Sequence, residues 1–116
     1  MDELYKQLHI YLNMNEEISL PEFDSYYKKV IDYFNEEADN FDEEKLWKAL
    51  FISENVMSNA DARSKESKKS DAKKFKKIAQ RLSLWAQNFT ARLAELGYSQ
   101  DEMNERFEKM FDDKPE

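Results

Sequence analysis

The sequence predicts an all-α fold, a compact bundle of about five helices around a long central antiparallel helical hairpin. Three features of the composition indicate this. The 116 residues include one glycine and two prolines, fewer than the turns of a β-sheet usually need. Charged residues make up 37% of the chain, which is typical of amphipathic helices with solvated outer faces. Eight Phe, six Tyr and two Trp residues supply large side chains for one core.

The first two helices are predicted from apolar spacing. Apolar residues recur at helical intervals from about Asp2 to Asn13, and a loop is expected to follow. Pro21 suits the first turn of a second helix, because the N–H that proline lacks has no helical partner there. From Phe23 to Phe34, apolar residues recur at intervals of three and four, which predicts a strongly amphipathic helix.

The third helix is predicted over about 42–66, with Asn40 or Asp42 as its N-cap. Its first half is apolar on nearly all sides, and a helix of that kind is usually central and covered by its neighbours. The residues expected on its inner face are Leu46, Ala49, Leu50, Ser53, Val56, Met57 and Ala60, whereas Trp47, Phe51 and Ile52 point in other directions.

A fourth helix is predicted over about 71–96, and a short fifth helix follows it. The apolar face of the fourth consists of Phe75, Ile78, Ala79, Leu82, Trp85, Ala86, Phe89, Leu93 and Leu96. Gly97 suits the left-handed position that ends a helix. Ser99 and Glu102 have the spacing of a capping box, which predicts the start of the fifth helix. Residues 1–112 are expected to form a single helical domain, and residues 113–116 a frayed tail.

The connection between the third and fourth helices has two interpretations, because no glycine or proline separates them. One continuous helix would leave the apolar faces of both segments without a partner. A turn near Ser67–Ser70 would bury the two faces against each other, and the apolar pattern favours this hairpin. Residues 61–74 form the tip of the hairpin in one interpretation and the middle of a long helix in the other.

Charge is distributed in three blocks. Residues 1–62 carry 15 acidic and 5 basic residues, residues 63–92 carry 2 acidic and 10 basic residues, and residues 93–116 carry 8 acidic and 3 basic residues. In a hairpin, the lysines of the middle block would gather at the tip, roughly 30 Å from the acidic base. Physiological salt screens charges over about 8 Å, so the base would not neutralise the tip.

The basic stretch has a structural and a functional interpretation. A lysine-rich helical segment is most often a solvated face. Alternatively, it binds an anionic partner through a group of candidate residues: Lys68, Lys69, Lys73, Lys74, Lys77, Arg81 and Arg92. The basic helix over 63–92 lacks exposed aromatic residues that could stack on bases, because Phe75 is expected on the core face. This absence counts against nucleic-acid binding.

Residues for catalysis or metal binding are scarce. His9 is the only histidine and the chain has no cysteine, so a zinc site or a histidine-based triad lacks partners. His9 is expected to be a surface or helix-packing residue, and no enzymatic activity, metal or cofactor is expected. The acidic N-terminus without a long apolar run, and the absence of cysteine, indicate a soluble, cytoplasmic protein.

These observations favour a small non-enzymatic helical protein that acts as a protein–protein interaction or regulatory module, with a basic hairpin tip and an acidic body. A protein partner is expected, and the separated charges also favour head-to-tail self-association. The alternative is a nucleic-acid-binding protein. Leu84 lies almost opposite the apolar face of the fourth helix. Together with Trp47 or Phe51 it is a candidate for a second contact surface, within this chain or toward another protein.

Overall fold

The computed structural model describes residues 1–115, and this part of the chain is all-α. It contains five α-helices, α1 (Asp2–Leu12), α2 (Leu20–Glu37), α3 (Glu43–Glu66), α4 (Lys69–Glu95) and α5 (Gln100–Met110), with a 3₁₀ turn, η1 (Ala38–Asn40), between α2 and α3. The described residues form no strand. The prediction of an all-α bundle of about five helices is therefore confirmed.

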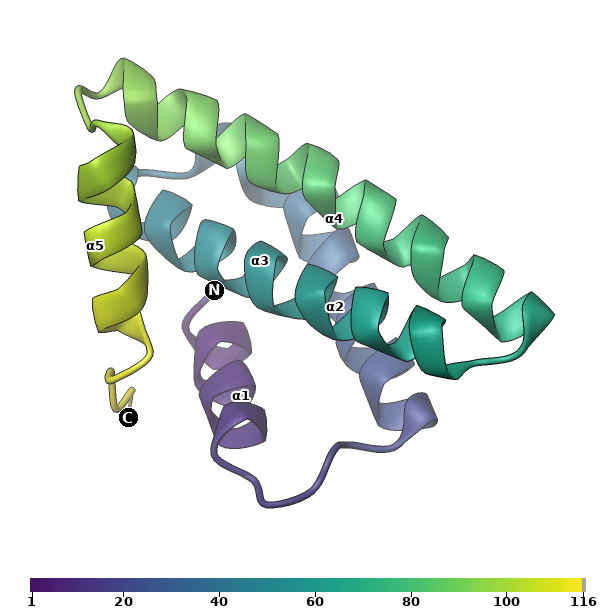
Figure 1. Cartoon of the computed structure of the whole chain (residues 1–116). Coiled ribbons are helices and arrows are strands. Elements are labelled where there is room, and N and C mark those ends of the chain that lie inside the picture. Colours follow the sequence, from purple (N-terminus) through teal and green to yellow (C-terminus); the bar gives the residue numbers. More distant parts are fainter. Residues whose placement is uncertain (116) are drawn as a thin grey trace.

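The α3–α4 hairpin is the centre of the fold (Figure 1). Helix α3 ends at Glu66, Ser67 and Lys68 form the turn, and α4 runs back along α3. The hairpin is thus present in place of one long helix, and α4 begins at Lys69 where residue 71 was expected. Ser67 and Lys68 are both extended, with φ of −100° and −84°, so the turn needs no glycine.

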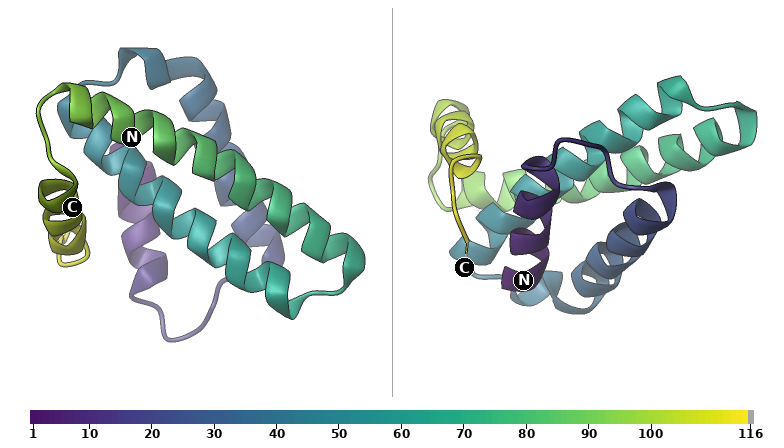
Figure 2. Two further views of the ribbon diagram at one scale, coloured as in Figure 1. Left: turned by 45° about the horizontal axis from the view of Figure 1, so that its top comes forward. Right: turned by 90° about the horizontal axis from the view of Figure 1, so that it is seen from below.

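The other helices cover different parts of this hairpin (Figure 2). In the view of Figure 1, α2 lies behind the hairpin, α1 lies below α3, and α5 crosses the base, which is the end opposite the turn. Helix α2 contacts α4 through three ring pairs, Phe23–Phe75 at 5.9 Å, Phe34–Trp85 at 5.4 Å and Phe34–Phe89 at 5.1 Å between centroids. The base and middle of the hairpin are therefore covered on several sides.

Capping side chains set the helix boundaries. Asp42 Oδ1 accepts a hydrogen bond from the Lys45 N–H at 2.9 Å, so Asp42 is the N-cap of α3 and Asn40 belongs to η1. Ser99 and Glu102 form the expected capping box of α5. Gly97 has a φ of 107° and ends α4 in the left-handed conformation, as predicted.

Helix α3 is the central helix, as its apolar sequence predicted. Trp47 is 2% exposed, and Phe51 and Ile52 have no exposed surface, although the sequence pattern placed none of the three on the inner face of the hairpin. The Phe51 ring contacts two rings of α1 and two rings at α5, namely Tyr5 at 5.6 Å, His9 at 5.2 Å, Phe107 at 5.3 Å and Phe111 at 4.9 Å between centroids. One ring of α3 therefore joins three helices.

The end of α4 and the C-terminal tail differ in part from the sequence pattern. Leu96, expected on the apolar face of α4, is 54% exposed, because the helix ends at Glu95 and the chain turns away at Gly97. In the tail, Asp113 accepts a hydrogen bond from the Tyr5 hydroxyl at 2.6 Å, which links it to α1. Glu116 lies outside the described residues, and the domain limits 1–112 and the frayed tail over 113–116 stay predictions.

Replacing Phe51 with Ala should lower the free energy of unfolding by about 3–5 kcal/mol, the usual cost of removing a fully buried aromatic ring. Urea denaturation followed by circular dichroism measures this difference. Leu84→Ala is a suitable control because Leu84 is 67% exposed on α4, and its effect should stay within about 0.5 kcal/mol. Equal losses in the two variants would contradict the central position of Phe51.

Candidate partner-binding site

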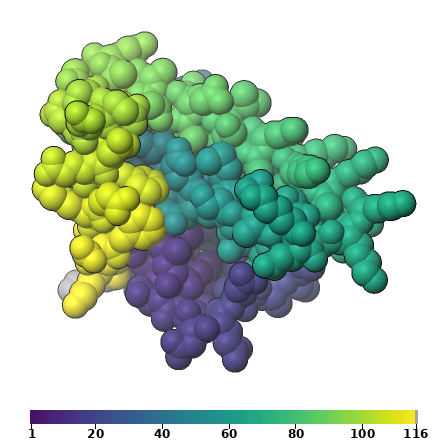
Figure 3. Space-filling model, viewed as in Figure 1, coloured from purple at the N-terminus to yellow at the C-terminus, as the bar shows by residue number. Residues whose placement is uncertain are grey.

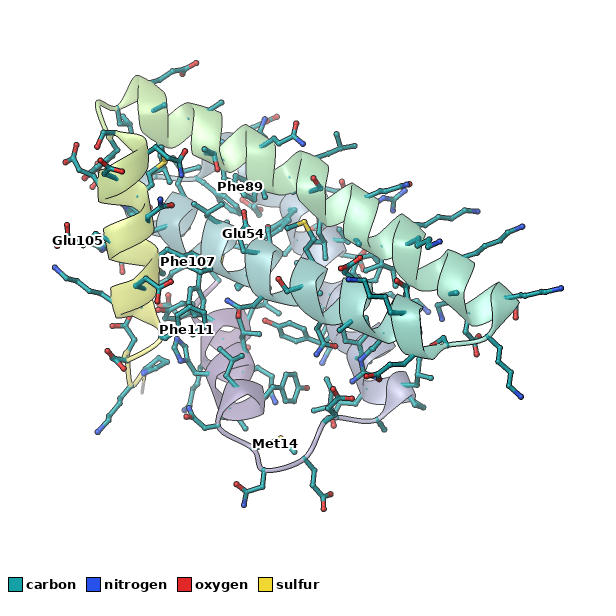
Figure 4. All side chains as sticks on the ribbon, viewed as in Figure 1. Met14, Glu54, Phe89, Glu105, Phe107 and Phe111 are labelled. Carbon is teal, nitrogen blue, oxygen red and sulfur yellow. The ribbon has the colours of Figure 1, made fainter. Side chains whose placement is uncertain are left out.

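The free end of the α3–α4 hairpin carries a group of exposed lysines. Long side chains protrude at this end in the space-filling view (Figure 3), and nitrogen-tipped side chains project from α4 into solvent (Figure 4). We define the basic tip as Lys65, Lys68, Lys69, Lys73, Lys76 and Lys77, which are all exposed. Helix α2 covers α4 as far as Phe75, which is 1% exposed against Phe23. Lys65, Lys68, Lys69 and Lys73 lie between this contact and the turn, and Lys76 and Lys77 follow Phe75 directly on α4.

The lysines of the basic tip are nearly free of intramolecular partners. Lys65 pairs with Asp61 at 3.4 Å, and both side chains are well exposed. Within residues 1–115, the other five lysines of the tip form no salt bridge. Residues 61–77 carry eight basic and three acidic side chains, so the end of the hairpin has a local positive charge on a chain whose net charge is −7.

Lys74, one of the candidate residues from the sequence, is engaged in the fold. Its Nζ lies 3.2 Å from Asp24 Oδ1, and Lys28 lies 3.0 Å from the other oxygen of the same carboxylate. The hydrogen bond from Lys28, assisted by Lys74, lowers the pKa of Asp24. Lys74 therefore links α4 to α2 and contributes less to an external anion site than its neighbours in sequence.

Arg81 and Arg92 lie away from the basic tip. Arg81 is exposed about halfway along α4, where it lines an open hollow with Leu84 and Trp85. The guanidinium of Arg92 donates to the Ala38 carbonyl at 2.8 Å and the Phe41 carbonyl at 3.4 Å, at the base of the hairpin. Arg92 thus satisfies backbone acceptors on both ends of η1, a role that helical spacing on α4 alone does not reveal.

Four of the seven candidate residues therefore share one surface, namely Lys68, Lys69, Lys73 and Lys77. Lys65 and Lys76 belong to the same tip but were not among those candidates. Lys76 follows Lys73 by three positions, and residues at this spacing are neighbours on a helix, so the sequence did contain a signal for it. Lys65 comes from α3, and the predicted hairpin already placed it at the tip, because the turn brings it beside the lysines of α4.

His9 is a buried packing residue. It is 4% exposed, and its ring lies 4.6 Å from the Tyr5 centroid and stacks on Phe51. Neither ring nitrogen has a hydrogen-bond partner within the described residues, and burial lowers the pKa of His9, so the neutral form is favoured. Of the two expectations for this residue, surface or packing, the structure supports packing.

Two further searches cover the part of the chain that the structure describes. Among residues 1–115, no group of three or more His, Asp or Glu side chains is placed to hold a metal ion. None of the helices in this range has the length and apolar content needed to cross a membrane.

The second contact surface predicted from Leu84 together with Trp47 or Phe51 is not one exposed surface in the fold. The Phe51 ring is covered by α1 and α5 and the Trp47 ring by Tyr98 and Arg106, so their contacts lie within this chain, while Leu84 stays exposed.

No family model, curated protein or solved structure matches this chain, so comparison with known proteins assigns no function to it. Interpretation of the basic tip therefore rests on its own geometry and charge.

Arg92→Ala should lower the free energy of unfolding by about 1.5–3 kcal/mol, because two carbonyls next to η1 lose a charged donor. Arg81→Ala, which removes an exposed arginine from the same helix, should change it by less than about 0.5 kcal/mol. Thermal and urea unfolding of both variants measure the difference. An Arg92→Ala protein as stable as the parent would show that the guanidinium contacts contribute nothing to folding.

Burial of His9 should make the fold less stable in mild acid. The pKa of His9 is lower in the folded chain than the ordinary value of 6.5, so the unfolded chain binds more protons once the pH falls below about 6.5. The free energy of unfolding should then decrease with falling pH, by at most about 1.4 kcal/mol per pH unit from this residue. Urea titrations between neutral and mildly acidic pH measure the slope.

His9→Phe should remove this slope, because phenylalanine keeps a ring between Tyr5 and Phe51 but does not titrate. All carboxylates, including Asp113 near His9, are the same in both proteins, so the difference between the two pH curves isolates the histidine. If the free energy of unfolding changed with pH in the same way in the parent and in the variant, His9 would not be the source of the slope.

Proposed function

We propose that this chain is a non-enzymatic protein–protein interaction module that docks the basic tip onto an acidic surface of a partner protein. The observation that supports this most directly is the set of six exposed lysines at the free end of the hairpin, five of which have no salt bridge within residues 1–115. We include the lack of enzymatic activity in the proposal because the only histidine is packed between aromatic rings in the core.

Exposed lysines are suited to fast, weak and salt-sensitive association. A single exposed ion pair contributes at most about 1 kcal/mol, so several must form together to give useful affinity. A concentrated positive surface also attracts an acidic partner over distance and raises the rate of encounter. The partner expected on these grounds is a protein with a compact cluster of Asp and Glu residues.

A partner protein is favoured over nucleic acid for two reasons. Acidic blocks flank the basic stretch on both sides in sequence, with net charges of −10 over 1–62 and −5 over 93–116, and these blocks repel a long polyanion more than a local acidic patch. In addition, the ring of Phe75 is 1% exposed, so it cannot stack on a base. Nucleic-acid binding through the basic helix over 63–92 remains the alternative that the experiment separates.

A second copy of this chain is one partner with the required acidic surface. Helix α5 exposes Asp101, Glu102, Glu105 and Glu108 at the end of the molecule opposite the basic tip. We therefore also propose head-to-tail contact between the basic tip of one copy and α5 of another.

We further propose a cytoplasmic location, which the absence of cysteine from the sequence supports.

The test compares a fluorescent glutamate-rich peptide with labelled single- and double-stranded DNA, each titrated with the protein in low and physiological salt. Fluorescence anisotropy should show salt-dependent binding of the acidic peptide. In the triple variant Lys69→Glu, Lys73→Glu and Lys77→Glu, the affinity should fall roughly tenfold or more, because three attractive contacts become repulsive.

The control reverses three exposed lysines outside the basic tip, Lys6→Glu, Lys29→Glu and Lys45→Glu, and so gives the same net charge as the triple variant. This control should retain most of the affinity. Equal losses of affinity in both variants would show that the net charge of the protein, and not the position of these lysines, controls binding. Micromolar DNA binding with a steep salt dependence, without peptide binding, would replace the proposal by its nucleic-acid alternative.

A further inference from the structure

A groove lies where the end of α1, the loop over 13–19, the first turn of α2 and the middle of α3 meet. Its volume is about 270 Å³. Leu8 from α1, Phe23 from α2 and Val56 from α3 form part of its apolar wall, and each of the three is at most 5% exposed. The groove therefore opens directly onto the core, through a gap that none of the helices covers.

Exposed apolar side chains are concentrated beside this groove. Of the seven large apolar residues that are exposed within residues 1–115, four lie between positions 10 and 20, namely Ile10, Leu12, Met14 and Leu20. Leu12 and Met14 line the groove itself, and Figure 4 shows Met14 on the loop that follows α1. Single exposed apolar residues are ordinary, but a cluster next to an apolar groove is typical of an interaction site.

The loop that borders the groove is held at both ends. Asn13 donates from its side chain to the His9 carbonyl at 2.8 Å, which caps the end of α1. At the other end, Arg63 of α3 donates to the Ile18 carbonyl at 2.8 Å, and Ser19 caps α2 by accepting from the Glu22 N–H. The groove is therefore preformed, so a ligand does not have to order the loop on binding.

Size and charge specify the occupant. Sites for complete small molecules are usually about 300–1,000 Å³, so a groove slightly smaller than this suits a few apolar side chains. Glu16 and Glu17 line the groove and are exposed, and neither forms a salt bridge within residues 1–115. An occupant with apolar anchors and adjacent cations matches both properties, whereas an anionic lipid surface would be repelled.

We propose that the groove between α1, α2 and α3 binds an amphipathic helical segment of another protein, with apolar anchors that enter the groove and Lys or Arg residues that pair with Glu16 and Glu17. Binding of an apolar helix face in a groove is a common mode of protein recognition. This site is separate from the basic tip and has the opposite charge preference, so it does not depend on the function proposed for the tip.

The first test uses two fluorescein-labelled helical peptides, one with Leu and Lys residues at amphipathic spacing and one with Glu in place of every Lys. Anisotropy should show binding of the Leu/Lys peptide only. In nuclear magnetic resonance spectra, that peptide should shift the amide signals of residues 10–20 and 55–59. Absence of binding by the Leu/Lys peptide, or shifts confined to other regions, overturns the proposal.

Matched variants separate the groove from general charge attraction. Glu16→Lys with Glu17→Lys should weaken binding of the Leu/Lys peptide roughly tenfold, because two attractive ion pairs become repulsive contacts. Glu36→Lys with Glu37→Lys gives the same net charge at the far end of α2 and should leave the affinity within about twofold. Equal losses in the two double variants overturn the proposal.

The apolar contribution has its own pair of variants. Met14→Ser should lower the affinity for the Leu/Lys peptide roughly fivefold, as expected when one partly buried apolar contact is lost. Leu84→Ser removes an exposed apolar residue from α4 and should have no effect. The triple variant of the basic tip should bind this peptide at least as well as the parent. If Met14→Ser binds like the parent, the groove is not the binding site.

Discussion

Burial of residues 46–53 of α3 on nearly all sides is the constraint on which the rest of this fold depends. Helix α4 covers one face of α3, and the remaining apolar residues, with Phe51 as the most connected, need cover from elsewhere. Helices α1 and α5 provide it, although each has only 11 residues and would be marginal alone in water. Their stability therefore comes from the rings they place on Phe51, and the bond from Tyr5 to Asp113 ties the two ends of the chain together.

Both candidate sites result from how far this cover extends. Helices α3 and α4 have 24 and 27 residues, and the shorter elements around them leave the turn end uncovered, where only polar side chains are stable. That end is the basic tip. Helix α1 ends at Leu12, before α2 begins at Leu20, and the loop between them spans the gap over Val56. The groove is therefore the place where the cover of α3 is interrupted.

The sequence predicted the features that depend on neighbouring residues, which are the helices and their caps. It missed the features that depend on contacts between distant segments of the chain. Apolar spacing identified the helices, and Gly97 and the pair Ser99–Glu102 marked their ends because capping acts within a few residues. No glycine or proline marked the turn at Ser67 and Lys68, since two extended residues need no special side chain, and only the apolar faces on either side of it predicted the hairpin. The roles of Lys74 and Arg92 depend on partners in α2 and around η1, about fifty residues away in the chain. The groove, too, exists only after α1 and α3 have met.

The separation of charge along the hairpin has a consequence for the motion of the whole molecule. The basic tip and the acidic α5 lie at opposite ends of a body whose longest dimension is 42 Å. At low ionic strength, the electric field of the acidic partner proposed above would pull on the basic tip and push on α5, so it would exert a torque as well as an attraction. Under those conditions the molecule would rotate toward its binding orientation before contact with that partner. Acidic residues of α5 that never touch the partner would thereby affect the association rate together with the lysines of the tip.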